Sequence, residues 1–181
     1  LLPSYPASKS ICALGGMVAN NSGGEKTLAY GKTEKYVQEL KVVLSDGNEY
    51  LFKPLTFSQL KQKIKKNGFE GEVYKKIYEL ISKNKKIIKN AKPDVTKNSS
   101  GYALWNVWPA RRSLGEGGNG KVFDLTKLFI GSQGTLGLVT EIKFKLIRPK
   151  KNSKLLVIFL KDLSLLTKIT HKILKSNPES F

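Results

Sequence analysis

Two glycine-rich segments, about a hundred residues apart, carry the residues whose types and spacing could do chemistry. They run from Leu14 to Gly24 and from Leu128 to Thr140. Both combine glycines with small polar side chains, which lets the backbone approach a phosphate or a flat ring closely. A pyrophosphate, for example, needs several N–H donors within about 3 Å. The two segments therefore predict a ligand-binding surface built largely from backbone.

The residues between these segments predict the elements that position them. A short helix is expected around residues 16–21, and residues 36–44 alternate in a way that predicts a strand. The turn Ser45-Asp46-Gly47-Asn48 predicts a hairpin to a second strand at 49–53, because Asp-Gly supplies positive φ angles. Helices are predicted from Thr56 or Ser58 to Asn67 and from Glu72 to about Lys89, with residues 68–71 breaking the pattern between them.

The second half of the chain predicts one more strand of the same sheet. Residues 94–122 show little periodicity and predict a long irregular excursion, after which Asp124 is expected to cap a short helix ending near Phe129. A strand over residues 136–146 should place Leu136, Leu138, Thr140, Ile142, Phe144 and Leu146 on one face. We therefore expect an α+β domain over residues 1–149, with a largely antiparallel sheet flanked by helices.

A second unit is expected to begin at residue 150. Arg148-Pro149-Lys150-Lys151-Asn152 is the one convincing boundary in the sequence. Beyond it, an apolar strand is predicted over residues 155–160, and a helix opened by Asp162. The only histidine, His171, falls on the solvated face of that helix, so neither a catalytic base nor a metal ligand is expected there.

The chain is strongly basic, with a formal net charge of +18 over 181 residues. Such a charge is typical of nucleic-acid binding, of anionic membranes or of a solvated lysine-rich surface. Because 29 of the 32 basic residues are lysine, and base and phosphate readers favour arginine, nucleic acid is not expected. A solvated surface and peripheral membrane association both stay open. The single cysteine, Cys12, excludes an internal disulfide and a multi-cysteine zinc site.

Three stretches, read in order, resemble a known family. The first is Pro6-Ala7-Ser8 with Cys12-Ala13-Leu14-Gly15-Gly16 and Ala19-Asn20-Asn21-Ser22-Gly23-Gly24; the second is Tyr30-Gly31-Lys32-Thr33 with Val42-Val43-Leu44-Ser45-Asp46-Gly47. The third runs from Phe129-Ile130-Gly131-Ser132-Gln133 to Thr140. Together they resemble the PCMH-type FAD-binding domain of the vanillyl-alcohol-oxidase superfamily, in the D-lactate dehydrogenase and glycolate oxidase branch. The resemblance covers about residues 2–149 and implies the second FAD-binding subdomain, followed by the start of a cap domain.

The resemblance implies that FAD is the cofactor and that backbone amides of these loops hold its pyrophosphate. By position, the residues that should line the pyrophosphate and ring side are Pro6, Ala7, Ser8, Cys12, Ala13, Gly15 and Gly16. Those that should follow the cofactor further are Asn20, Asn21, Ser22, Gly23 and Gly24, and those on the returning strand are Gln133, Gly134, Thr135, Leu136, Gly137, Leu138 and Val139. This sequence departs from the family pattern at three positions, which affects individual cofactor contacts. Tyr5 stands where many family members have Asp, Ala13 where Thr is common, and Gln133 where most have Glu.

Two further stretches invite more than one interpretation. Residues 115–120 satisfy G-x-G-x-x-G, but residues 110–114 before them do not look like a strand, so we interpret them as a loop tip and not as a dinucleotide fingerprint. Residues 98–105 resemble a family stretch that approaches the flavin and substrate side; the alternative is a loop anchored in the core by Tyr102 and Trp105. A covalent flavin on Cys12 is conceivable, and an unmodified side chain is the main expectation.

The resemblance implies an FAD-linked oxidoreductase of a small D-2-hydroxy acid such as lactate or glycolate. A base takes the hydroxyl proton, the flavin accepts a hydride, and electrons pass to a quinone, a cytochrome, an electron-transfer flavoprotein or oxygen. It also implies that the first subdomain, most of the cap domain and the catalytic and metal-binding histidines lie outside this chain, which alone should be inactive. The alternatives are a non-redox FAD transferase resembling alkyl-dihydroxyacetonephosphate synthase, and a basic nucleic-acid- or membrane-binding module. A cytoplasmic location is expected, with peripheral membrane association left open.

Overall fold

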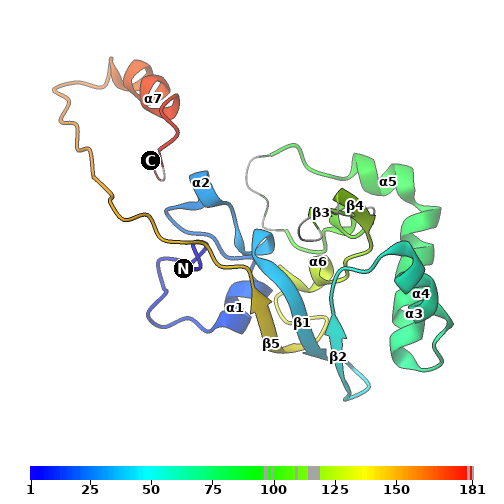
Figure 1. Ribbon diagram of the computed structural model, residues 1–181. Coiled ribbons are helices and arrows are strands. Elements are labelled where there is room, and N and C mark those ends of the chain that lie inside the picture. Colours follow the sequence, from blue (N-terminus) through cyan, green and yellow to red (C-terminus); the bar gives the residue numbers. More distant parts are fainter. Residues whose placement is uncertain (96–97, 99, 109, 114–118, 179, 181) are drawn as a thin grey trace.

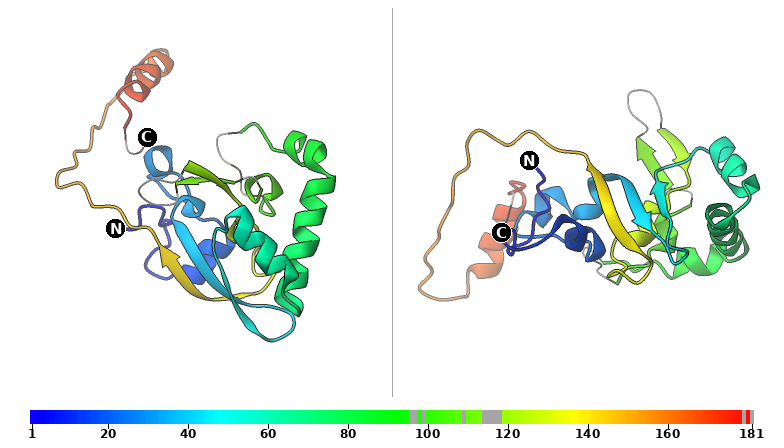
Figure 2. Two further views of the ribbon diagram at one scale, coloured as in Figure 1. Left: turned by 45° about the vertical axis from the view of Figure 1, so that its right-hand side comes forward. Right: turned by 90° about the horizontal axis from the view of Figure 1, so that it is seen from below.

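The computed structural model describes residues 1–95, 98, 100–108, 110–113, 119–178 and 180. An N-terminal segment, a small central sheet and a group of helices lie beside one another, and residues after β5 run away from them to a last helix (Figures 1 and 2). Helices and a small antiparallel sheet in one chain are the α+β class expected from the sequence. The elements of the first part are α1 Leu14–Ala19, α2 Thr27–Tyr30, the 3-10 turn η1 Thr33–Lys35, β1 Val37–Val43 and β2 Glu49–Phe52.

The central sheet has three antiparallel strands in the order β2-β1-β5, where β5 is Leu138–Phe144. The predicted hairpin between β1 and β2 is confirmed. Gly47 has a φ of 79°, and the Asn48 amide donates to Asp46 Oδ1 at 3.2 Å. An Asp-Gly turn therefore sets the register of this hairpin, in which Val43 lies opposite Glu49.

The prediction that alternate residues from Leu136 to Leu146 share one face of β5 is wrong, because a β-bulge interrupts the alternation of the strand. Lys41 lies opposite Glu141 and Val42 opposite Val139, so Thr140 is the extra residue. The Thr140 hydroxyl donates to Glu49 Oε1 at 2.6 Å, at the surface. Before the bulge, Leu138 faces outward and is 70% exposed, whereas Val139 packs against the core, as do Ile142 and Phe144 after it.

Three helices form the part of the molecule beyond β2: α3 Phe57–Lys65, α4 Phe69–Lys83 and α5 Lys85–Asn90. The predicted cap of α3 is confirmed, since Thr56 and Gln59 form a reciprocal capping box. The predicted break at residues 68–71 is shorter than expected, because α4 already begins at Phe69. The predicted helix to Lys89 is divided at Asn84, whose side-chain amide donates to the Leu80 carbonyl at 2.9 Å.

The core lies between the sheet and these helices and is strongly aromatic. Phe52 contacts Tyr74 and Phe129 at ring-centroid distances of 6.0 and 4.7 Å. Phe123 contacts Tyr74 at 6.1 Å and Trp108 at 6.1 Å. These rings join β2, α4 and α6 (Thr126–Phe129) into one packed unit. The predicted cap of α6 is wrong by one residue, because Leu125 is its N-cap; the Asp124 carboxylate nevertheless accepts from the Thr126 amide at 3.2 Å.

The excursion over residues 94–122 is more ordered than predicted. It contains the 3-10 turn η2 Leu104–Asn106 and an antiparallel pair, β3 Ala110–Ser113 with β4 Asn119–Val122. The expectation that residues 110–114 are not strand-like is therefore wrong for 110–113. The argument against a dinucleotide fingerprint still holds. Such a fingerprint needs a helix after its glycines, whereas here the chain continues as the antiparallel strand β4. Residues 115–118 of that motif lie outside the described residues.

The region after β5 differs from its prediction. Residues 155–160 form no strand, and Leu155 and Phe159 are 89% and 91% exposed. The last helix, α7 Leu166–Leu174, has Leu165 and not Asp162 as its N-cap, and the Asp162 carboxylate accepts from the Ser164 amide at 2.7 Å. His171 is exposed on α7, as predicted. Among the described residues, the structure contains no helix long and apolar enough to cross a membrane.

Candidate functional site

The structure joins the two glycine-rich segments by backbone hydrogen bonds. The Gly131 amide donates to the Val18 carbonyl at 3.0 Å, and the Gln133 amide donates to the Ala19 carbonyl at 2.9 Å. The end of α1 therefore holds the turn that leads into β5. Segments more than a hundred residues apart in the chain thus share one surface, as a binding site assembled from both of them requires.

Three of the predicted glycines face open space. A Cβ added at Gly16 or at Gly134 would meet no described atom within 4 Å, and one at Gly15 would only reach the Val139 carbonyl at 3.9 Å. Gly134 also has a φ of +79°, which favours glycine for conformational reasons. Packing within the described chain does not explain glycine at Gly15 and Gly16. A ligand that needs the backbone within reach would explain it.

Three other predicted glycines serve the fold. A Cβ at Gly24 would lie 2.2 Å from the Tyr5 carbonyl oxygen, and one at Gly23 would lie 2.6 Å from Thr27 Oγ1. At Gly137, with φ +156°, the Val43 carbonyl would be 2.6 Å away. These glycines let two pieces of backbone pass close to each other, so the sequence motif mixes glycines of two kinds.

Helix α1 offers backbone donors at this surface. Ala13 precedes it in an extended conformation, and no described side chain caps it. The first amides of a helix have no partner inside the helix, and they carry its partial positive charge. In α1 these amides belong to Leu14, Gly15 and Gly16. Because Ala13 has no hydroxyl, unlike the Thr that is common at this position in the family, only backbone groups can make polar contacts with a ligand here.

The remaining residues of the first segment divide between exposed and structural positions. Ala7, Ser8, Ala13 and Asn20 are exposed, while Pro6 and Cys12 are half-buried. The Ser8 carbonyl accepts from the amides of Ile11 and Cys12, both at 3.0 Å, which shapes the exposed turn. Ser22 is used internally, because its carbonyl accepts from the Thr33 amide at 2.9 Å and the Thr33 hydroxyl at 2.8 Å.

Left-handed backbone conformations gather at this surface. Among the described residues, the non-glycine residues with positive φ are Asn21, Tyr102, Gln133 and Asn177, and the first three lie in or beside the two segments. Such conformations cost of order 1–3 kcal/mol each and tend to cluster at functional sites. Asn21 is 8% exposed, and its Oδ1 accepts from the Glu34 amide at 3.0 Å, which fixes the end of the first segment.

In the second segment, Gln133, Gly134 and Thr135 are exposed, whereas Leu136, Gly137 and Val139 are half-buried. The Thr135 hydroxyl donates to the Ser132 carbonyl at 2.6 Å and is also hydrogen-bonded to the Tyr102 hydroxyl. This leaves the Gln133 side chain and the Gly134 backbone as the outermost groups of the turn.

Tyr102 and Gly101 bring a third stretch to the site. Gly101 packs so closely on the second segment that a Cβ there would lie 2.2 Å from the Gly131 carbonyl oxygen. Tyr102 is 47% exposed, so the alternative in which it anchors a loop in the core is wrong for this residue. The structure thus places Gly101 and Tyr102 beside the predicted cofactor segments. Sequence reasoning marked the stretch through its resemblance but could not give it this position.

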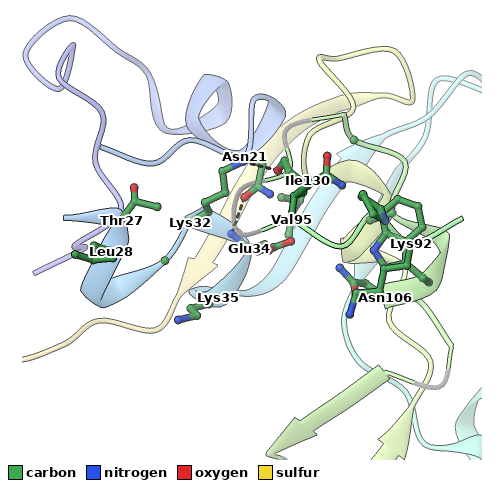
Figure 3. Close-up of a pocket in the computed structure, with 16 residues that line it drawn as sticks. Asn21, Thr27, Leu28, Lys32, Glu34, Lys35, Lys92, Val95, Asn106 and Ile130 are labelled. Carbon is green, nitrogen blue, oxygen red and sulfur yellow. Dashed lines mark hydrogen bonds between the residues drawn. The ribbon is translucent and has the colours of Figure 1, made fainter. Parts of the chain in front are cut away.

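A cavity of about 420 Å³ lies beside the site, between α2–η1 and residues 92–106 (Figure 3). Asn21 and Ile130 line it from the glycine-rich segments, and Trp105 lines it from the excursion. Lys32, only 8% exposed, also lines this cavity, and its ammonium donates to the Asn98 carbonyl at 2.5 Å. Sequence reasoning missed Lys32, because nothing in its local pattern separates it from the many surface lysines.

Comparisons of the sequence with known proteins identify relatives of this chain. Residues 1–50 match the family model of the FAD binding domain. The D-2-hydroxyglutarate dehydrogenase of Escherichia coli is 29% identical over 142 residues, which cover 78% of this chain and 13% of that protein. The glycolate oxidase subunit GlcD of Bacillus subtilis is 28% identical over 87% of this chain and 21% of its own length. The D-lactate dehydrogenase of Anaerostipes hadrus is 29% identical over 87% of this chain and 20% of its own length.

The chain thus spans about an eighth to a quarter of the length of the curated relatives it matches. The family model covers the first glycine-rich segment, and relatives that match 87% of the chain extend far beyond that model. The family model and the relatives confirm both the resemblance and the FAD cofactor that it implies. This chain contains a PCMH-type FAD-binding domain, in the branch that includes the D-2-hydroxyglutarate and D-lactate dehydrogenases and glycolate oxidase.

Proposed function

We propose that this chain is the second FAD-binding subdomain of a flavoenzyme that oxidises a small D-2-hydroxy acid, such as 2-hydroxyglutarate, lactate or glycolate. The names of the relatives support this class of substrate. The observation that carries the proposal is the surface on which α1 and the turn at residues 131–135 are bonded together, with Gly16 and Gly134 open. Residues 150–181 are proposed to begin the substrate-binding cap domain.

The residues of this surface fit an extended cofactor that carries phosphates. The amides of Leu14, Gly15 and Gly16 are the donors of an uncapped helix start, and the positive end of the helix favours a negative group. The absence of side-chain atoms around Gly16 and Gly134 leaves the space that such a group or a flat ring requires. Pro6, Ala7, Ser8, Cys12, Ala13, Asn20 and Leu138 remain proposed contacts by their position in the motif.

FAD supplies the hydride acceptor of the reaction, and this chain supplies binding and orientation. The Gln133 amide bond to Ala19 and the Tyr102–Thr135 hydroxyl pair hold the turn at residues 131–135 in one conformation. A preformed surface lowers the conformational entropy lost on binding, which improves affinity without new contacts. The proposed partners are the hydroxy acid, further parts of the same polypeptide and an electron acceptor: a quinone, a cytochrome, an electron-transfer flavoprotein or oxygen.

The test is a visible absorption spectrum of the purified full-length protein before and after acid precipitation. The proposal predicts a flavin band that is bleached by D-2-hydroxy acids under anaerobic conditions and not by their L enantiomers. A band released into the supernatant identifies non-covalent FAD, and a band that stays in the pellet identifies covalent attachment, for which Cys12→Ser is the next variant. A protein that contains no flavin and acquires none when FAD is added would contradict the proposal.

A further inference from the structure

The helical part of the molecule is unusually rich in lysine. Residues 53–92, which we call the lysine-rich lobe, comprise Lys53 and the helices α3, α4 and α5. These 40 residues contain 12 of the 29 lysines, whereas the other 141 residues contain 17. Acidic residues are equally dense in both parts, with three in the lobe and eleven elsewhere. A general lysine bias of the whole sequence therefore does not account for the lobe.

The few acidic residues of the lobe neutralise little of this charge. Glu70 is buried and forms ion pairs with Lys63 and Lys66, and Glu72 forms one with Lys76 at 3.3 Å. Most of the remaining lysines stand on the surface: Lys61, Lys65, Lys75, Lys83, Lys85, Lys86 and Lys89 are exposed. So many like charges repel one another, which destabilises a compact lobe unless an anionic partner is present.

Apart from Lys92, which lines the cavity beside the site, this charge lies away from the candidate cofactor surface. In Figure 1 and in the right-hand view of Figure 2, α3–α5 form one edge of the molecule, with the strands of the sheet between them and α1. At physiological ionic strength, charges on the surface act over only about 8 Å. The sheet lies between α3–α5 and α1, so we look for a separate explanation of the charge on these helices.

Exposed apolar side chains stand among these lysines. Ile87 is 69% exposed and Leu80 is 46% exposed, near the break between α4 and α5 at Asn84. Ile87 lies in α5 next to Lys86 in the chain, and Lys83 ends α4 just before the break. Basic residues around apolar side chains suit an anionic lipid surface, because the lysines meet the headgroups while the apolar groups enter the interface.

The same lobe is poorly suited to nucleic acid. It contains no arginine, the residue that best matches phosphates and base edges. Three of its four aromatic rings have ring partners, and only Phe69, 37% exposed, has none among the described residues. Phe57 stacks on Trp108 at 5.8 Å, and Tyr78 contacts Trp108 and Phe123 at 6.3 and 6.2 Å. Rings held in this way are not free to stack on bases, which single-strand binders require.

We propose that the lysine-rich lobe docks the protein on an anionic lipid surface. Each lysine close to such a surface strengthens binding about fivefold at physiological salt. A cavity of about 450 Å³ bordered by Lys53, Lys63, Lys65 and Lys66, together with Gln59 and Gln62, offers room for a lipid headgroup. The proposal does not depend on which substrate the flavoenzyme oxidises, since the lobe and the cofactor surface are separate.

The experiment is co-sedimentation of the full-length, FAD-loaded protein with vesicles of phosphatidylcholine alone or mixed with phosphatidylserine. The lobe variant replaces Lys83, Lys85, Lys86 and Lys89 with Glu, and the matched control replaces Lys151, Lys154, Lys161 and Lys168, which are equally exposed. We expect binding to the mixed vesicles only, at least about 100-fold weaker binding of the lobe variant, and a much smaller loss in the control. Ile87→Ser should weaken binding several-fold without changing the charge.

Three outcomes would overturn the proposal. One is no binding of the unaltered protein to phosphatidylserine vesicles at low salt. Another is an equal loss in the lobe variant and the control, which would show an effect of net charge alone. The third is retention of binding in the lobe variant. The flavin spectrum of every variant is recorded in parallel, so that failure of lipid docking and failure of the cofactor proposal are told apart.

Discussion

The glycine-rich surface and the lysine-rich lobe lie on opposite sides of the same sheet and achieve order in different ways. At the surface, the order comes from backbone: the Gly131 and Gln133 amides bond to the end of α1, left-handed conformations recur in both segments, and chains pass closely, as Gly24 does against Tyr5. In the lobe, it comes from side chains, with an aromatic core around Tyr74 and a buried glutamate. The two regions should therefore respond to different substitutions. At the surface, replacing a glycine with a larger residue should be the most damaging change, whereas in the lobe it should be the truncation of a buried side chain.

The largest expected effect separates the two kinds of glycine within the surface itself. Gly24→Val should destabilise the fold by more than about 3 kcal/mol, because its Cβ would collide with the Tyr5 carbonyl. Gly16→Val should change stability by less than about 1 kcal/mol, since the Cβ meets no described atom, yet it should weaken FAD binding at least about tenfold. Urea unfolding and FAD titration measure the two effects. Equal destabilisation by both variants would refute the distinction.

A smaller effect is expected at the buried glutamate of the lobe. Glu70→Ala should cost about 1–3 kcal/mol, because it removes the partner of Lys63 and Lys66 from a position that is 7% exposed. The matched control is Glu72→Ala, whose ion pair with Lys76 is exposed and should contribute less than about 0.5 kcal/mol. Urea unfolding of the two variants would show similar losses if burial were irrelevant.

At the surface, Tyr102→Phe should cost about 1 kcal/mol, because it removes the hydroxyl that bonds Thr135 while keeping the ring. If that bond fixes the turn at residues 131–135, FAD affinity should fall a few-fold as well, and the flavin spectrum should shift. Thr135→Val removes the other partner and should behave in the same way. A double variant that loses affinity as the sum of the two single losses would argue against direct coupling.

The smallest expected effect is that of removing the Tyr74 hydroxyl from the aromatic core. The Tyr74 hydroxyl is buried and finds no hydrogen-bond partner among the described residues. Burial also raises the pKa of Tyr74, so the phenol stays neutral. Tyr74→Phe should therefore leave the free energy of unfolding unchanged or raise it by up to about 1 kcal/mol. Tyr74→Ala should lower it by about 3–5 kcal/mol, because the ring contacts are lost. A clear loss of stability in Tyr74→Phe would indicate a bound partner, such as an internal water.

Local chemistry made much of the fold predictable. The Asp46-Gly47 turn fixes its hairpin, and Thr56 with Gln59 fixes the start of α3, because these residues act within a few positions of the chain. The Thr140 bulge, the break at Asn84 and the β3–β4 pair depend on contacts with distant residues, so local periodicity could not reveal them. The candidate site shows the same division. Its glycines stand out in the sequence, whereas the separation into open and packed glycines needs the tertiary structure.

The central claim is that the open glycines of the surface face FAD, and one pair of variants tests it most directly. Gly134 and Gly47 both have a φ of +79°, and a Cβ at either would meet no described atom within 4 Å. Gly134 lies on the candidate surface and Gly47 in the hairpin turn. Gly134→Ala and Gly47→Ala should therefore lose similar stability, about 1 kcal/mol each. In a titration with FAD, the account predicts at least about tenfold weaker binding for Gly134→Ala alone; equal affinities of the two variants would contradict it.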